Sequence, residues 1–162
     1  MHLIDLLGPA RVVAGAKITS KKRLLELLAR LLADGQLVGG QGNDSERRIF
    51  ESLCAREKLG STALGHGIAI PHGRSDALTA ASGCFVQLDQ PIDFGAPDGQ
   101  PVDLLFAMAV PEHFTHQHLL LLSQLAEMFS DPNLSARLRA SRDAKTLFAQ
   151  LADWHPASAV AA

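Results

Sequence analysis

The chain has no tyrosine and few aromatic residues of any kind, which make up 5% of its 162 residues. Its formal net charge is only -2. Proteins that bind nucleic acid present basic patches and aromatic stacking platforms, and proteins that bind anionic membrane surfaces carry clustered positive charge. The composition therefore gives no indication of a nucleic-acid or membrane partner.

Long apolar runs and paired cysteines are also missing. No stretch reaches the roughly 20 apolar residues of a membrane-spanning helix. The N-terminal segment MHLIDLLGPARVV lacks the basic region and long apolar run of a signal peptide. Cys54 and Cys84 lie far apart and form no metal-spaced pair. We expect two reduced thiols in a cytoplasmic protein that needs neither a metal nor a cofactor.

What is present is typical of one soluble globular domain, with 47% hydrophobic and 20% charged residues. Ser20 is placed to cap a helix that ends at Gly35. A second helix is expected to start at Asp44 or Ser45 and to end before Gly60. Apolar residues recur at helical spacing in both segments, namely Leu24, Leu25, Leu28, Leu31 and Leu32 in the first and Ile49, Phe50, Leu53 and Cys54 in the second.

The middle of the chain changes to strand patterns, and the last part returns to helices. Residues 1–8 predict a short helix or strand. Strands are predicted at Arg11–Val13, Leu64–Ile70, Gly83–Leu88 and Leu104–Val110, and helices at about 115–130, 132–140 and 142–152. Helical segments on both sides of a small strand-rich centre favour a sheet between two helical layers.

The segment GHGIAIPHGR, residues 65–74, places a histidine between a proline and a glycine. Pro71 has no N–H and keeps Ile70 extended, so an interior strand is expected to end there. Gly73 carries no side chain and would leave room for another molecule beside His72. Arg74 adds a guanidinium suited to phosphate or carboxylate. A neutral imidazole presented in this way can act as a nucleophile, although an ordinary surface turn would have the same pattern.

Two distant residues fit the same chemistry. Arg56 continues the inward stripe of the second helix, where it could reach an anion in a cleft or simply stabilise the helix end. In the segment PEHFTHQHLLLLSQLAEMF, His118 shares a helix face with the leucines that follow it, whereas His116 points roughly opposite and His113 precedes the helix. A histidine on an apolar face can also be an ordinary core residue.

A metal site is the first alternative, because five histidines are crowded in sequence at positions 66, 72, 113, 116 and 118. The spacing argues against it. In an extended strand His66 and His72 would be about 20 Å apart. His116 and His118 diverge on a helix, and no helical HExxH pair or cysteine pair is present.

The run AREKLGSTALGHGIAIPHGR, residues 55–74, resembles the active-site segment of a known family. MHLIDLL, SKKRLLELLA and VPEHFTHQHLLLLSQLA fit the same family. The family that these segments resemble is the enzyme IIA domain of the bacterial phosphoenolpyruvate-dependent phosphotransferase system (PTS), fructose/mannitol type. Within that family, the resemblance is to the stand-alone nitrogen-regulatory branch. The resemblance covers residues 2–150, and a frayed tail is expected over 151–162. His66 stands where the motif often has another polar residue.

This resemblance implies an α+β fold, a three-layer α/β/α sandwich around a small mixed sheet. It also implies a phosphoryl carrier in which His72 receives a phosphoryl group from a histidine-phosphorylated HPr-like carrier protein. Arg56 and His118 match the arginine and second histidine of the active site. The face around Gly67, Gly73 and Arg74 would meet protein partners, and its charge would change on phosphorylation.

Two alternatives to the regulatory function stay open. A sugar-specific enzyme IIA that passes phosphate to a transport-coupled IIB domain would use His72, His118 and Arg56 in the same way. A non-catalytic binding module of this fold would keep the residues without the reaction. The length of the chain leaves no room for fused transport domains, which favours the regulatory branch.

Overall fold

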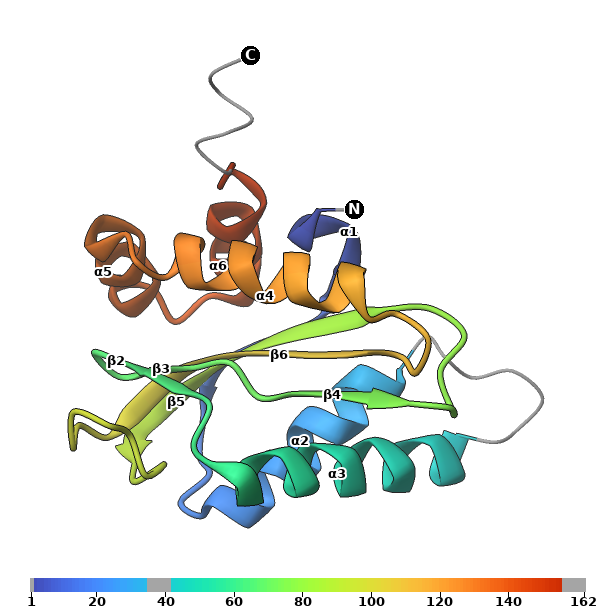
Figure 1. Cartoon of the computed structure of the whole chain (residues 1–162). Helices are drawn as coiled ribbons and strands as arrows, with labels where there is room; N and C mark the ends of the chain where they lie inside the picture. Colours follow the sequence, from blue (N-terminus) through green and yellow to red (C-terminus); the bar gives the residue numbers. More distant parts are fainter. Residues whose placement is uncertain (1, 35–41, 156–162) are drawn as a thin grey trace.

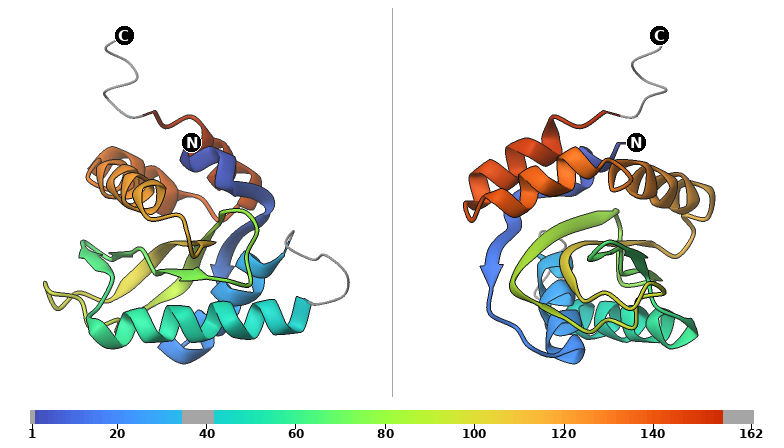
Figure 2. Two further views of the ribbon diagram at one scale, coloured as in Figure 1. Left: turned by 45° about the vertical axis from the view of Figure 1, so that its right-hand side comes forward. Right: turned by 90° about the vertical axis from the view of Figure 1, so that its left-hand side faces the viewer.

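The computed structural model describes residues 2–34 and 42–155, and they form three layers (Figure 1). Helices α2 (Lys21–Ala33) and α3 (Gly42–Leu59) cover one face of a mixed sheet. The other face is covered by α4 (His116–Met128), α5 (Pro132–Ala140) and α6 (Ala144–Ala152), with the short α1 (Leu3–Leu6) beside them (Figure 2). The predicted α+β sandwich is confirmed.

The sheet is built around β6. The strands lie in the order β1 (Leu7–Ala16), β5 (Ser82–Ile92), β6 (Val102–Pro111), β3 (Ile68–Ala69) and β2 (Ala63–Gly65), and β4 (His72–Ser75) also pairs with β6. The β5–β6 and β2–β3 pairs are antiparallel, whereas β1 runs parallel to β5 and both β3 and β4 run parallel to β6. Two consecutive short strands therefore share one side of β6.

Two hydrophobic cores lie on the opposite faces of this sheet. Alternate residues of a strand point to opposite faces, so β6 contributes to both cores. Leu105 and Ala107 pack toward α2 and α3, while Phe106 and Met108 pack toward α4–α6. Both faces of β6 are buried, which explains why its sequence reads as an unbroken apolar run rather than an alternating one.

The helix boundaries follow local capping chemistry. Ser20 Oγ accepts a hydrogen bond from the backbone N–H of Arg23, as the sequence predicted. The predicted end of this helix at Gly35 lies outside the described residues. Helix α3 begins at Gly42, two residues before the expected start, and ends at Leu59 directly before Gly60. Asp131 and Asp143 cap α5 and α6 through their carboxylates.

The strand predicted over Leu64–Ile70 is wrong, because this segment is a hairpin of β2 and β3. His66 and Gly67 form its turn with φ angles of 57° and 79°. Positive φ at both central residues is typical of a type I′ turn, which suits the twist of antiparallel strands. Asp98 Oδ2 accepts a hydrogen bond from the His66 backbone N–H at 2.8 Å and so holds the turn. The 20 Å separation expected for an extended chain between His66 and His72 therefore does not apply.

The first strand extends beyond its predicted boundaries, whereas the last helix ends where it was predicted to end. The N-terminal segment is both helix and strand, since α1 leads directly into the ten-residue β1, which is longer than the expected Arg11–Val13. At the other end, α6 continues to Ala152, and Leu151 is buried in the core. The last helix therefore ends at the residue predicted for it, since the expected span was 142–152.

Candidate functional site

His72 is the first residue of β4, not the end of the preceding strand. It pairs in register with Met108 of β6, and the Pro71 carbonyl accepts a hydrogen bond from the Met108 N–H at 3.0 Å. Pro71 therefore separates two short strands on the same side of β6. The proline lacks a donor, as the sequence indicated, but the chain resumes pairing immediately after it. This arrangement places the His72 side chain at the sheet edge, half-buried.

The backbone fixes the protonation of the His72 ring. Nδ1 lies 2.8 Å from the carbonyl oxygen of Ile70. A carbonyl can only accept a hydrogen bond, so Nδ1 carries the proton and Nε2 keeps its lone pair in the neutral ring. The Ile70 carbonyl therefore fixes the tautomer of the His72 ring. Ile70 is itself held, because its N–H donates to the Thr62 carbonyl at 3.1 Å.

His118 lies directly beside His72. The two ring centroids are 5.3 Å apart and the ring planes meet at 89°. His118 sits in the first turn of α4 and is 9% exposed, on the same face as the buried Leu121 and Leu125. His116 is exposed, so the predicted separation of these two histidines is confirmed. His118 Nε2 is buried without a hydrogen-bond partner among residues 2–34 and 42–155.

Burial keeps both rings neutral. It is the largest cause that lowers the pKa of His118, to about 4, and the neighbouring His72 and Arg74 add to the effect. Burial also lowers the pKa of His72 below 6.5; the Ile70 carbonyl opposes this shift, and the positive charge of Arg56 strengthens it. At neutral pH both imidazoles are therefore uncharged.

The two predicted arginines come from different elements, α3 and β4. Arg56, in the last turn of α3, donates from Nη1 to the Gly60 carbonyl at 2.8 Å. Arg74 is exposed and donates from Nη1 to Thr115 Oγ1 at 3.3 Å, just before α4. Each arginine acts electrostatically on one ring, Arg56 on His72 and Arg74 on His118. The structure thus brings Arg56 and His118, which are distant in the sequence, into the electrostatic surroundings of His72 and Arg74.

The two predicted partner-binding glycines have other surroundings. Gly73 is buried, and a β-carbon there would overlap Ser52 Oγ of α3. Its missing side chain makes room for α3 rather than for a partner, which corrects the sequence-based interpretation. Gly67 is also buried, in the turn of the β2–β3 hairpin, where a β-carbon would meet the guanidinium of Arg139 at 2.6 Å.

A network behind His72 was not identified from the sequence. The Glu57 carboxylate, whose side chain is 5% exposed, forms an ion pair with Lys21 Nζ at 3.0 Å and accepts a hydrogen bond from Thr62 Oγ1. Thr62 connects α3 to Ile70 and hence to the Nδ1 proton of His72. Glu57 and Thr62 both lie within the run AREKLGSTALG, and this position in the motif is the sequence feature that could have indicated their role.

In the ranges 2–34 and 42–155 no three histidine, cysteine or acidic residues are grouped so that they could hold a metal ion. Within the same ranges no helix has the length and apolar character needed to cross a membrane.

Comparison with solved structures defines the class of the fold. The structure of nitrogen regulatory protein IIA-Ntr from Neisseria meningitidis superposes with a TM-score of 0.83 at 40% sequence identity, covering 92% of this chain and 98% of that one. The IIA mannitol structure from Escherichia coli has a TM-score of 0.72 at 22% identity, over 89% of this chain and 97% of the other. The chain therefore has the fold of phosphotransferase-system IIA domains.

Sequence comparison identifies the family. The model for the phosphoenolpyruvate-dependent sugar phosphotransferase system, EIIA 2, matches residues 5–154. The nitrogen regulatory protein of Bradyrhizobium diazoefficiens is 43% identical over 94% of this chain and 95% of its own length, and that of Pseudomonas aeruginosa is 42% identical over 94% and 96%. The chain belongs to the EIIA type 2 family of the phosphotransferase system.

Proposed function

We propose that this chain is a nitrogen-regulatory IIA protein that accepts a phosphoryl group on His72 from a histidine-phosphorylated HPr-like carrier protein. The observation that carries the proposal is the state of the His72 ring. Its Nδ1 proton is held by the Ile70 carbonyl and its pKa is depressed, so Nε2 presents a lone pair at neutral pH. Family membership supplies the reaction class, which is phosphoryl transfer.

In the proposed step, the Nε2 lone pair of His72 attacks phosphorus as the bond from phosphorus to the donor imidazole breaks. The bonding electrons return to the donor ring, so no additional reactant is needed. The His72 ring takes up positive charge as the new N–P bond forms, and the Ile70 carbonyl stabilises that charge through the Nδ1 proton. Such transfers depend mainly on positioning and charge stabilisation.

The neighbouring residues have distinct parts in this step. His118 stays neutral, with a pKa of about 4, so it can act as a hydrogen-bond donor to a phosphoryl oxygen and not as a cation. Arg56 and Arg74 supply the positive charge, the first beside His72 and the second at the exposed rim near Thr115. Arg74 is the better placed of the two to meet an incoming partner, because it is exposed.

The regulatory role follows from the charge that the reaction adds. A phosphoryl group adds close to two negative charges, and at His72 it would change the sign of the surface beside Arg74. Target proteins in the cytoplasm would bind one state and not the other, without a change of fold. Relatives that are 42–43% identical along nearly their whole length are named nitrogen regulatory proteins. A 2-O-alpha-mannosyl-D-glycerate-specific EIIABC component from Escherichia coli is only 30% identical, and this chain spans 23% of it.

The test is intact mass after the chain is mixed with phosphoenolpyruvate, the first enzyme of the system and its histidine carrier. We expect a gain of one acid-labile phosphoryl group in the native chain and none in His72→Ala. His116→Ala is the matched control, because His116 is exposed on the same helix as His118 and should leave the gain unchanged. No gain with an active donor, or the same gain in His72→Ala, would contradict the proposal.

A further inference from the structure

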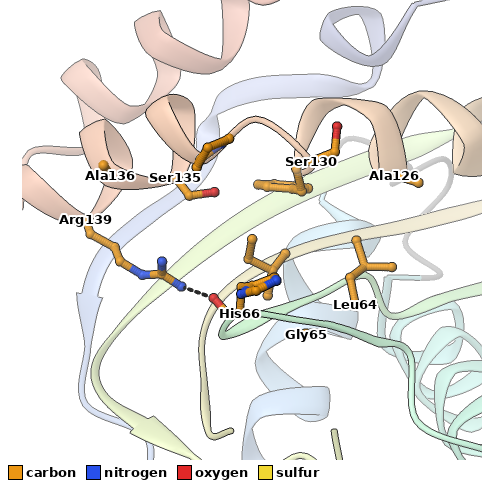
Figure 3. Close-up of a pocket in the computed structure, with 11 residues that line it drawn as sticks. Leu64, Gly65, His66, Ala126, Ser130, Ser135, Ala136 and Arg139 are labelled. Atoms are coloured by element: carbon orange, nitrogen blue, oxygen red, sulfur yellow. Dashed lines mark hydrogen bonds between the residues drawn. The ribbon is translucent and has the colours of Figure 1, made fainter. Parts of the chain in front are cut away.

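A cavity lies away from His72, between the β2–β3 hairpin and the junction of α4 with α5 (Figure 3). Its volume is about 840 Å³. Ile68, which lines it, pairs with Leu104 of β6, whereas His72 pairs with Met108. The pocket is therefore displaced by four residues along β6, or about 13 Å. It also lies at the end of α4 opposite to His118.

The pocket has the size and wall chemistry of a small-molecule site. Binding sites for small organic ligands typically enclose about 300 to 1,000 Å³ between apolar walls with a few polar groups. Here the hairpin supplies one wall, and the end of α4 and the start of α5 supply the other. The apolar side chains of these walls are Leu64, Ile68, Ala126, Phe129, Pro132 and Ala136.

One polar group in this wall, the Ser135 hydroxyl, has no hydrogen-bond partner among the residues that the structure describes. Ser135 is 5% exposed, and its Oγ makes no hydrogen bond within the part of the chain that the structure describes. Figure 3 shows this oxygen on the side of α5 that faces the hairpin. A buried hydroxyl without a partner is costly, so its presence in a pocket wall indicates a ligand that completes the hydrogen bond. Ser130, also in the wall, is different, because its Oγ donates to the Glu127 carbonyl at 2.6 Å.

A second polar group is already neutralised. The Arg139 guanidinium lies at one end of the pocket, paired with both carboxylate oxygens of Asp103 through Nε and Nη2. Nη2 also donates to the His66 carbonyl at 2.6 Å (Figure 3). An anionic ligand would bring a further negative charge close to Asp103 and would be repelled by it. A neutral carbonyl could accept a hydrogen bond here without that repulsion.

We propose that this pocket is a binding site for a small uncharged molecule with an apolar body and a carbonyl group, such as an amide or ester. The apolar body would occupy the space between Ile68 and Phe129, and the carbonyl oxygen would accept hydrogen bonds near Ser135 and Arg139. The site goes beyond the proposed phosphoryl transfer, since it uses none of the residues around His72.

The test is a titration of the isotope-labelled chain with phenylacetamide, followed by NMR of the backbone amides. The probe is taken to about 10 mM, because so small a molecule is expected to bind with a dissociation constant of about 1 mM. We expect saturable shifts concentrated in residues 64–68 and 126–136. Phenylacetate, which has the same body and a negative charge, should bind at least about fivefold more weakly.

Matched variants locate the site. Ala126 is exposed and lines the pocket, so Ala126→Trp should fill the space and abolish the shifts without disturbing the core. Ser123→Trp adds the same side chain at an exposed position of α4 outside the pocket and should leave binding unchanged. Ser135→Ala should weaken binding of the amide about fivefold.

Three outcomes would overturn the proposal. The pocket would not be a ligand site if no saturable shifts occurred in residues 64–68 and 126–136. Unchanged binding in Ala126→Trp would place the ligand elsewhere on the chain. Equal or tighter binding of phenylacetate would contradict the assignment of an uncharged ligand. Because the readout does not involve His72, failure here would leave the phosphoryl-transfer proposal intact, and failure of phosphorylation would leave this site intact.

Discussion

The imidazole rings of His72 and His118 meet edge to face, with their centroids 5.3 Å apart. At this distance two protonated rings would repel each other strongly in a partly buried site. The site therefore favours two neutral rings, and His72 adds to the burial that lowers the pKa of His118. One ring has its Nδ1 proton fixed by the backbone and the other is held within the helical layer.

This arrangement predicts the pH dependence of phosphoryl uptake. The pKa of His72 is depressed below 6.5, so its neutral, nucleophilic form dominates at all pH values above that depressed pKa. The uptake rate should be flat near neutral pH and should fall only as the pH drops through the depressed value. Single-turnover transfer from the phosphorylated carrier measures the rate, with the pH stability of the donor measured in parallel.

NMR titration of the His72 ring provides the control for this prediction. Arg56 lowers the pKa of His72 by its positive charge, so Arg56→Ala should raise that pKa and Arg56→Lys should leave it closer to the native value. A native His72 that titrates at or above 6.5, or an Arg56→Ala variant in which its pKa falls, would contradict the electrostatic account.

A second prediction concerns His118. Its pKa of about 4 makes it a neutral hydrogen-bond donor at pH 7. His118→Ala should slow phosphoryl uptake roughly 100-fold, which is the effect of removing one preorganised donor from a transition state. His118→Gln keeps an N–H donor and should recover part of the rate. Single-turnover kinetics at saturating donor protein separates this effect from weaker docking.

His116→Ala is the matched control for His118, because His116 lies two residues away on the same helix but is exposed. Its rate should equal that of the native chain. If His118→Ala transferred phosphate at the native rate while remaining folded, His118 would be a core residue and not part of the reaction, which is the alternative that the sequence pattern leaves open.

The layers of the fold could be predicted because their signals are local. Periodic leucines and the Ser20 cap indicate α2, the apolar and β-branched residues around Phe85 indicate β5, and an unbroken apolar run indicates β6. The β2–β3 hairpin could not be predicted in the same way. Its turn depends on His66, a non-glycine residue at φ 57°, held by a carboxylate that comes from Asp98. A contact between residues so distant in sequence leaves no periodic pattern in the segment itself.

Among the site residues, too, those with a local sequence signal could be predicted and those that depend on distant contacts could not. His118 and His116 could be separated by helical geometry alone, and the structure confirms it. The partner of His72 Nδ1 could not be identified from the sequence, because every residue has a backbone carbonyl. Only the break between β3 and β4 places the carbonyl of Ile70 at 2.8 Å. Gly73 was assigned to a partner because its neighbour Ser52, on α3, cannot be recognised from the sequence.

The contact between Gly73 and Ser52 gives a third prediction. A β-carbon at position 73 would overlap Ser52 Oγ, so Gly73→Ala should lower the free energy of unfolding by about 2 kcal/mol. Ser52→Ala alone loses the hydrogen bond from Ser52 Oγ to the Arg74 carbonyl, which costs about 1 kcal/mol. Urea denaturation of the native chain and the two single variants measures both effects.

The double variant decides whether the overlap is the cause. Removing Ser52 Oγ relieves the closest contact, so Gly73→Ala with Ser52→Ala should be more stable than the sum of the two losses by about 1 kcal/mol. If the two losses of stability were strictly additive, glycine would be needed at position 73 for its backbone conformation and not for the space that it leaves to α3.

The last prediction concerns Thr62, which joins two parts of the site. Its hydroxyl donates to the buried Glu57 carboxylate, and its carbonyl accepts from the N–H of Ile70. Thr62→Val keeps the shape of the side chain but removes the hydroxyl that donates to the Glu57 carboxylate, which then keeps only its ion pair with Lys21 among these two side-chain contacts. The free energy of unfolding should therefore fall by about 2 kcal/mol. Thr62→Ser keeps the hydroxyl and should cost less than about 1 kcal/mol.

A positioning role for Thr62 requires an effect on the His72 ring as well as on stability. Loss of the hydroxyl frees the segment that carries Ile70, so the hydrogen bond that fixes Nδ1 should weaken in Thr62→Val. We therefore expect the Nδ1 proton of His72 to exchange faster and phosphoryl uptake to slow about fivefold, with both restored in Thr62→Ser. A Thr62→Val variant that is less stable but keeps the native proton exchange and uptake rate would show that the Glu57 network supports the fold alone.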